Sequence, residues 1–167
     1  MWSPDDTSIC TIWNVTVEVY DVGVQLCLFV DTIVYDADDT IISSNTEQGG
    51  ALLPDGAFTL DQQLRTATLA PVTVTVFALA CDEFGGCIPT DTNPREITIS
   101  GTWTGVSELM RSKQSYRTDE GRCKITYTTH SEERQATATL TIDGQVLETE
   151  YAYLNRSRTS DKQIGCA

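Results

Sequence analysis

The sequence predicts an all-β protein: an antiparallel immunoglobulin-like β-sandwich with an attached C-terminal β-meander, stapled by disulfides. Three observations predict this fold. Threonine makes up 25 of the 167 residues, and Thr, Val and Ile fit a pleated, half-buried strand. Apolar and polar residues alternate with a period of two in segment after segment. Turn signals separate about seven such segments in the first 104 residues, as they do in a sandwich.

The first two segments differ in their expected burial. In residues 11–21, Trp13, Val15 and Val17 alternate with polar side chains, which predicts a strand with one buried face. Residues 24–30 are apolar on both sides of the chain, which predicts a central strand with both faces covered.

The middle of the chain is less regular. Serine, asparagine and glycine turn signals break up residues 41–61, so we expect short edge strands and loops there. Pro71 is expected to interrupt the strand pattern, and a long strand should follow it over residues 72–81. Another alternating strand is expected over residues 95–103.

The C-terminal part continues in the same style. Residues 107–116 contain helix-forming side chains, but no N-cap and no helical apolar stripe, so we expect a strand. Asp143-Gly144 lies between two alternating segments and predicts a two-residue hairpin turn, because type I′ turns need a positive φ at both positions. The apolar faces are thin, so this part should pack on the first part or be stapled.

Charge suggests how the chain is divided. Residues 1–100 hold 15 acidic and two basic residues, whereas residues 101–167 hold nine of each, so the first part carries the whole net charge of −13. We therefore expect a flexible lead-in (1–8), an acidic β-sandwich (9–104) and a β-meander packed on the sandwich (105–167). One continuous domain with a single acidic face fits the sequence nearly as well.

The charge and hydropathy also bear on partners. A net charge of −13 disfavours nucleic acid and anionic membrane surfaces, because both repel it. No apolar run approaches the ~20 residues needed to span a bilayer, so we expect no membrane insertion.

The even number of cysteines suggests disulfides and an oxidising compartment. Six cysteines allow 15 connectivities, and the favoured pairing follows from position along the chain: Cys81–Cys87 across a turn, Cys123–Cys166 in the second part and Cys10–Cys27 on adjacent strands. We expect a secreted or cell-envelope protein from which a signal peptide has been removed, with Met1 added.

The stretch CDEFGGC, Cys81 to Cys87, is the candidate recognition site. It opens a loop of about thirteen residues, 82–94, where a plain connector would need only a few. A disulfide and two prolines would restrict this loop, so less entropy is lost on binding. We expect Asp82, Glu83 and Phe84 at the tip to contact a partner. In the alternative interpretation the staple only protects the loop, and Phe84 folds back onto the sheet.

Catalytic and metal signals are weak. His130 is the one histidine, and no nucleophile or orienting motif accompanies it, so we expect no catalytic residues. The cysteine spacing does not suit structural zinc or a redox pair. The acidic turn with Asp36, Asp38 and Asp39 offers oxygen ligands for calcium, although a merely solvated turn is commoner. Calcium is the one cofactor that the sequence suggests.

The sequence therefore favours a binding or structural module that recognises a protein or carbohydrate partner at the cell surface, and not an enzyme. Two alternatives stay open. One is a small hydrolase with an acidic site, since 24 carboxylates are present. The other is a disulfide-rich protease inhibitor that presents loop 82–94.

Overall fold

The computed structural model describes residues 7–20, 22–121 and 123–164. Within these residues the chain is all-β and antiparallel and contains no helix, as the sequence predicts. The strands are β1 (Ser8–Tyr20), β2 (Gly23–Tyr35), β3 (Ile41–Leu53), β4 (Phe58–Leu60), β5 (Thr66–Cys81), β6 (Cys87–Pro89), β7 (Arg95–Gly105), β8 (Met110–Glu120), β9 (Cys123–Ile142) and β10 (Gln145–Ile164). Residues 1–6 of the expected lead-in lie outside the described residues.

The strands belong to one sheet, in the order β1-β2-β3-β5-β7-β9-β10. The short strands β4 and β6 pair with β5, and β8 pairs with β9. The immunoglobulin-like sandwich is not confirmed, because that fold needs two separate sheets packed face to face. The described residues contain no helix that could cross a membrane.

Residue contacts divide the chain into two compact units. Unit 1 comprises Met1–Phe58, Ala70–Ile99 and Ile142–Gly144, and unit 2 comprises Thr59–Leu69, Ser100–Thr141 and Gln145–Ala167. The strands β5 and β7 run without a break from one unit into the other. The expected domain division near Gly101 stays a prediction.

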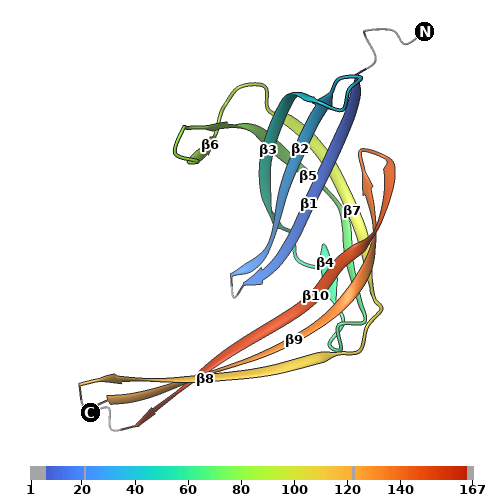
Figure 1. Cartoon of the computed structure of the whole chain (residues 1–167). Helices are drawn as coiled ribbons and strands as arrows, with labels where there is room; N and C mark the ends of the chain where they lie inside the picture. Colours follow the sequence, from blue (N-terminus) through green and yellow to red (C-terminus); the bar gives the residue numbers. More distant parts are fainter. Residues whose placement is uncertain (1–6, 21, 122, 165–167) are drawn as a thin grey trace. The chain divides into compact units, whose positions relative to one another are not determined.

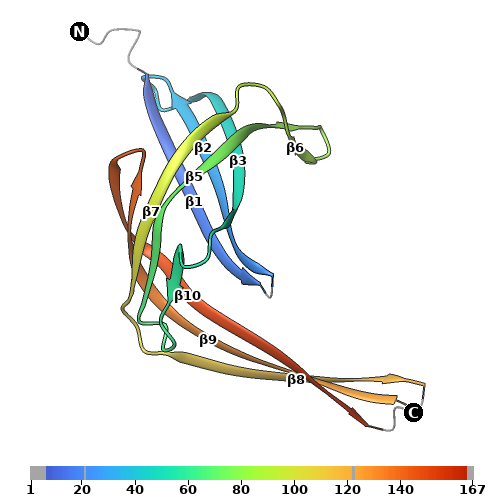
Figure 2. The same cartoon turned by 180° about the vertical axis from the view of Figure 1, so that it is seen from behind.

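In unit 1, β1, β2 and β3 form a meander that leads into β5 (Figures 1 and 2). On β2, Leu26, Leu28 and Val30 are fully buried, while Gln25 before them and Phe29 among them are exposed. The prediction that β2 is covered on both faces is therefore wrong. A single sheet buries one face by curling over it, and the inward residues of β5 and β7 complete this core: Val74, Val76, Ile97 and Ile99.

Two further expectations about strands are wrong. β3 is one strand of 13 residues that passes through the serines and glycines taken as turn signals. β5 continues through Pro71. This proline lies between the part of β5 beside β4 and the part that pairs with β3.

In unit 2, β8 is a strand that pairs with β9, which confirms a strand over residues 110–116 of the predicted 107–116. The inward residues of β9 and β10 build the core: Ala136, Ala138, Leu140 and Leu154. Leu64 is also fully buried, on a turn with φ of 55°. Two arginines hold this turn, since Arg134 donates to the carbonyl of Gln63 at 3.0 Å and Arg156 to that of Gln62 at 2.7 Å.

The turn between β9 and β10 confirms the hairpin prediction. Asp143 and Gly144 have φ of 49° and 83°, which is the type I′ geometry that a two-residue hairpin needs. The Asp143 carboxylate also accepts from the amide of Thr98 at 2.8 Å, and the Asp143 amide donates to the Thr98 carbonyl at 2.9 Å. The turn is therefore fastened to β7.

Candidate functional site

The stapled hairpin between β5 and β6, residues 81–87, stands out from the strands of unit 1 (Figures 1 and 2). Cys81 and Cys87 form the predicted disulfide, and their Cα atoms lie 4.0 Å apart. The two residues are also paired in the β5–β6 ladder. The covalent bond thus closes a turn that backbone pairing already defines.

Asp82 holds the turn from inside. Its carboxylate accepts hydrogen bonds from the amides of Phe84 at 3.0 Å and Gly86 at 2.8 Å. The two glycines suit this turn, because Gly85 has φ of 83° and a Cβ on Gly86 would lie 2.9 Å from the Asp82 carboxylate and displace it. Asp82 therefore positions the tip, and contact between its carboxylate and a partner stays a prediction.

The far end of the loop is also anchored. Thr90 donates from its amide and its hydroxyl to the carbonyl of Ala78, at 2.8 and 2.9 Å. Arg95, at the start of β7, donates hydrogen bonds from Nε and Nη2 to the carboxylate oxygens of Glu47 on β3, at 2.6 to 3.1 Å. The hydrogen bond from Arg95 to this carboxylate raises the pKa of Arg95 above its ordinary value. The loop is thus attached to strands at both ends.

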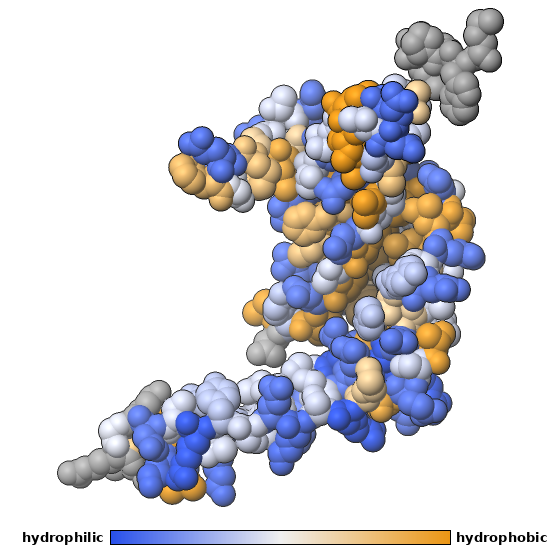
Figure 3. Space-filling view, in the orientation of Figure 1, coloured by the Kyte–Doolittle hydropathy of each residue, from blue (hydrophilic) through white to orange (hydrophobic). Residues whose placement is uncertain are grey.

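Phe84 lies at the tip and is 89% exposed, and Ile88 on β6 is 69% exposed. Glu83 beside Phe84 is exposed as well. The alternative in which Phe84 folds back onto the sheet is therefore wrong. Figure 3 shows apolar and hydrophilic side chains together on this projecting hairpin.

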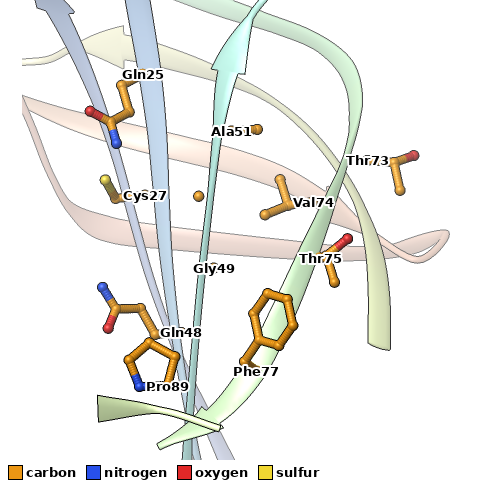
Figure 4. Close-up of a pocket in the computed structure, with 11 residues that line it drawn as sticks. Gln25, Cys27, Gln48, Gly49, Ala51, Thr73, Val74, Thr75, Phe77 and Pro89 are labelled. Atoms are coloured by element: carbon orange, nitrogen blue, oxygen red, sulfur yellow. The ribbon is translucent and has the colours of Figure 1, made fainter. Parts of the chain in front are cut away.

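A shallow groove of about 500 Å³ lies on the outer face of unit 1 (Figure 4). β3 pairs with β5 only over Glu47–Gly49, and the groove opens where the two strands part. The strands meet closely at the last pair, because a Cβ on Gly49 would lie 2.4 Å from the Thr75 carbonyl oxygen. Neutral side chains line the groove, among them Gln25, Cys27, Gln48, Thr73, Thr75 and Phe77.

The cysteine pairing is partly corrected. Cys10 and Cys27 are free, so the predicted Cys10–Cys27 bond is wrong. In the β1–β2 register Cys10 lies opposite Ile33 and Cys27 opposite Thr16. Six residues of strand separate them, roughly 20 Å, far beyond the reach of a disulfide. Cys123 is disulfide-bonded, and its predicted partner Cys166 lies outside the described residues.

The acidic stretch with Asp36, Asp38 and Asp39 forms a turn that hydrogen bonds to a carboxylate stabilise. The Asp36 carboxylate accepts from the amides of Asp38 and Thr40, both at 2.9 Å, and Asp39 has φ of 60°. Over the described part of the chain, no group of three or more Asp, Glu, His or Cys residues is placed to hold a metal ion. Calcium at Asp36, Asp38 and Asp39 stays a prediction.

Comparison of the chain with family models, curated proteins and solved structures gave no match. The functional argument for this protein therefore depends on its own geometry.

The Glu47–Arg95 anchor was not predicted from the sequence. Glu47 is 8% exposed, although the sequence places it in a polar stretch between serines and glycines. Glu47 and Arg95 are 48 residues apart, so no local spacing links them. One signal was available, since Arg95 is one of only two basic residues among the first hundred and follows directly after the candidate loop.

Proposed function

We propose that this chain is the binding module of a secreted or cell-envelope protein and recognises a protein or carbohydrate partner through the stapled hairpin. The observation that carries the proposal is Phe84, a large aromatic side chain 89% exposed at the tip of a fixed turn. A lone exposed aromatic is usual on a protein surface. One held by a disulfide and a carboxylate cap is less so, because both devices fix its position without burying it.

The fixed backbone supports this role energetically. Association costs entropy when loops and side chains become ordered at the interface. The backbone of the hairpin is ordered before binding, so mainly the Phe84 side chain has freedom left to lose. Aromatic side chains are also enriched among the residues that dominate binding energy. Glu83 beside the ring adds a charge that favours a partner with a complementary cation.

Two other functions have less support. A hydrolase needs facing carboxylates at a cleft, and the groove in unit 1 is lined by amides, hydroxyls, a thiol and apolar groups. A protease inhibitor presents an extended segment to the enzyme, whereas the hairpin tip is a tight turn. The Asp82 amide donates to the Gly86 carbonyl at 2.8 Å and the Gly85 amide to the Asp82 carbonyl at 3.1 Å.

The test is the substitution Phe84→Ala. We expect it to weaken partner binding about 30-fold, since a dominant aromatic contributes about 2 kcal/mol. Thermal stability should stay within about 0.5 kcal/mol of the wild type, because the ring is exposed. Immobilised wild type and variant are compared on a cell-surface protein extract and on an array of neutral glycans, with retained species quantified by mass spectrometry or fluorescence.

Tyr151→Ala is the matched control, because Tyr151 is an equally exposed aromatic, at 92%, on β10. A true partner is retained by the wild type and by Tyr151→Ala but lost with Phe84→Ala. If every retained protein and glycan is bound equally by all three chains, the hairpin is not the recognition site and the proposal fails.

A further inference from the structure

A second surface lies on the arm, which we define as β8 with the stretches of β9 and β10 beside it, residues 110–120, 123–133 and 155–164. β8 and β9 pair antiparallel, with Lys113 opposite His130 and Arg117 opposite Thr126. Hydrogen bonds between the hydroxyls of Thr129 and Thr159 and of Ser131 and Ser157 fix the register of β10. The same register places Arg158 beside His130 and Lys162 beside Thr126.

The register sorts the charges of the arm onto one face. Cross-strand neighbours share a face of a sheet, so the basic residues of the three strands fall together. Among the described residues of the arm, this basic face carries seven cationic side chains and two carboxylates, Asp119 and Glu132. The cationic residues are Arg111, Lys113, Arg117, Lys124, Arg156, Arg158 and Lys162. Figure 3 shows hydrophilic side chains along this arm.

Most of this positive charge is not neutralised. Glu132 is shared by two cations, since Arg111 donates to it at 3.0 Å and Arg156 forms an ion pair with it. In the described chain no ion pair or side-chain hydrogen bond involves the exposed residues Lys113, Arg117, Arg158 and Lys162.

The cations of this face lie close together. Lys113 and Arg158 flank His130 across three strands, so the two cations are two strand spacings apart with no carboxylate between them. Two residues further along lie three hydroxyls, Ser115, Thr128 and Ser160, and beyond them Arg117 and Lys162. Strands lie about 4.8 Å apart and alternate residues about 6.8 Å apart, so the face is a grid of cations with a hydroxyl row between them.

We propose that this basic face binds an anionic polysaccharide. Sulfate or carboxylate groups on an extended chain would pair with the cations that no carboxylate of the arm neutralises. The sugar hydroxyls would meet the row of Ser115, Thr128 and Ser160. Most of the cationic side chains of this face are exposed, as a surface for an extended polymer must be.

The same face suits nucleic acid and lipid less well. Proteins that bind single strands stack bases on aromatic side chains, but the stacked pair Tyr116–Tyr127, with ring centroids 4.9 Å apart, lies on the opposite face of the arm. The face of a three-stranded sheet also has no helix or two-stranded ribbon that could enter a duplex groove. A lipid surface would favour several exposed apolar side chains beside the cations, and among the described residues of this face the one exposed large apolar side chain is Ile164, at its end.

The net charge of −13 does not prevent this binding. At physiological ionic strength the Debye length is about 8 Å, so a polyanion on the arm responds mainly to the charges nearest to it. The sequence-based exclusion of anionic partners concerned the chain as a whole and does not describe this face.

The test uses the full chain and three probes: dextran sulfate, unmodified dextran and a 20-base-pair DNA duplex. We expect the wild type to bind dextran sulfate, with log Kd rising linearly with log salt, and to bind dextran and DNA at least tenfold more weakly. Lys113→Gln/Arg158→Gln should weaken dextran sulfate binding at least tenfold and lower the salt slope by about two, since two ionic contacts are lost. Calorimetry or fluorescence anisotropy provides the affinities.

Ser112→Glu/Gln114→Glu is the matched control, because it lowers the net charge by the same two units from the opposite face of β8. It should bind dextran sulfate within about threefold of the wild type. Equal loss in both variants would show that only net charge matters and would overturn the proposal. Binding of unmodified dextran or of the duplex as tight as that of dextran sulfate would overturn it too, because the recognised group would not be the anionic polysaccharide.

Discussion

At the scale of single residues, Glu47 shows how the candidate loop is attached to the sheet. Its carboxylate is buried on the inward side of β3, opposite Ala78. A buried charge is tolerated only when it is paired and hydrogen-bonded. Arg95 provides both the opposite charge and the hydrogen bonds to this carboxylate, while its own side chain stays 44% exposed. Arg95, the first residue after the loop, thereby acts as its anchor.

We expect Arg95→Met to destabilise the protein by about 1–3 kcal/mol, because it leaves the Glu47 carboxylate buried without its cation. Urea denaturation followed by circular dichroism measures this loss. The double variant Glu47→Leu/Arg95→Met should recover most of it, since an apolar pair leaves no unsatisfied group. A double variant as unstable as Arg95→Met would show that the cost comes from packing and not from the unpaired charge.

Sequence reasoning succeeded where a feature of the site is local. The Cys81–Cys87 bond was predictable because the two cysteines are only six positions apart across a turn. It failed for Cys10 and Cys27, because adjacent strands do not bring two cysteines together unless the register does. The basic face was missed for a similar reason, since it needs the register of three strands at once.

At the scale of strands, alternation was a sound guide to where strands occur and a poor guide to their ends. Serines and glycines within β3 resemble a turn in sequence, yet Gly49 is in the strand because β5 approaches too closely for a side chain. Continuous apolar runs misled in β2, because Phe29 and Cys27 on its outer face lie only partly covered. The Asp143-Gly144 turn was predictable because its dipeptide dictates the backbone.

The turn between β4 and β5 contains a carboxyl group, Asp61, whose pKa depends on the fold. Asp61 accepts backbone hydrogen bonds from Arg65 and Gln63, which lower the pKa of its carboxyl. Hydrogen bonds from Arg156 and Arg111 lower the pKa of Glu132, and Arg156 also holds the turn. A carboxyl whose pKa is lower in the folded state stabilises the fold above its unfolded pKa and loses that contribution as the pH falls through the folded value.

We therefore expect the contribution of these two groups to the free energy of unfolding to stay constant from pH 7 down to about pH 5. Below about pH 4 this contribution should decrease. Urea melts at several pH values measure it. Asp61→Asn/Glu132→Gln should be less stable than the wild type at pH 7 and depend less on pH below 4. An unchanged acid slope in this variant would show that other carboxyls cause the sensitivity.

At the scale of the whole molecule, the sequence could not distinguish two packed sheets from one. Both bury one face of each strand, so both give the same alternation. The difference lies in the strand order, and this depends on pairings between residues far apart in the chain, such as β3 with β5. The change in charge near Gly101 did not distinguish the two folds either, because β7 passes through this position as a single strand.

The continuity of the long strands leads to the last prediction. β5 and β7 each place residues in both compact units, so unfolding one unit would remove the partners of strands that continue into the other. We expect a single cooperative transition, as for one domain. Trp13 belongs to unit 1 and Trp103 to unit 2, and the variants Trp2→Phe/Trp103→Phe and Trp2→Phe/Trp13→Phe leave one reporter in each. For each variant, the urea transition followed by fluorescence should coincide with the transition followed by circular dichroism. The midpoints of the two variants should differ only by the effect of the substitutions on stability. Two separate transitions, with different midpoints for the two tryptophans and a biphasic circular dichroism curve, would instead establish two independent domains.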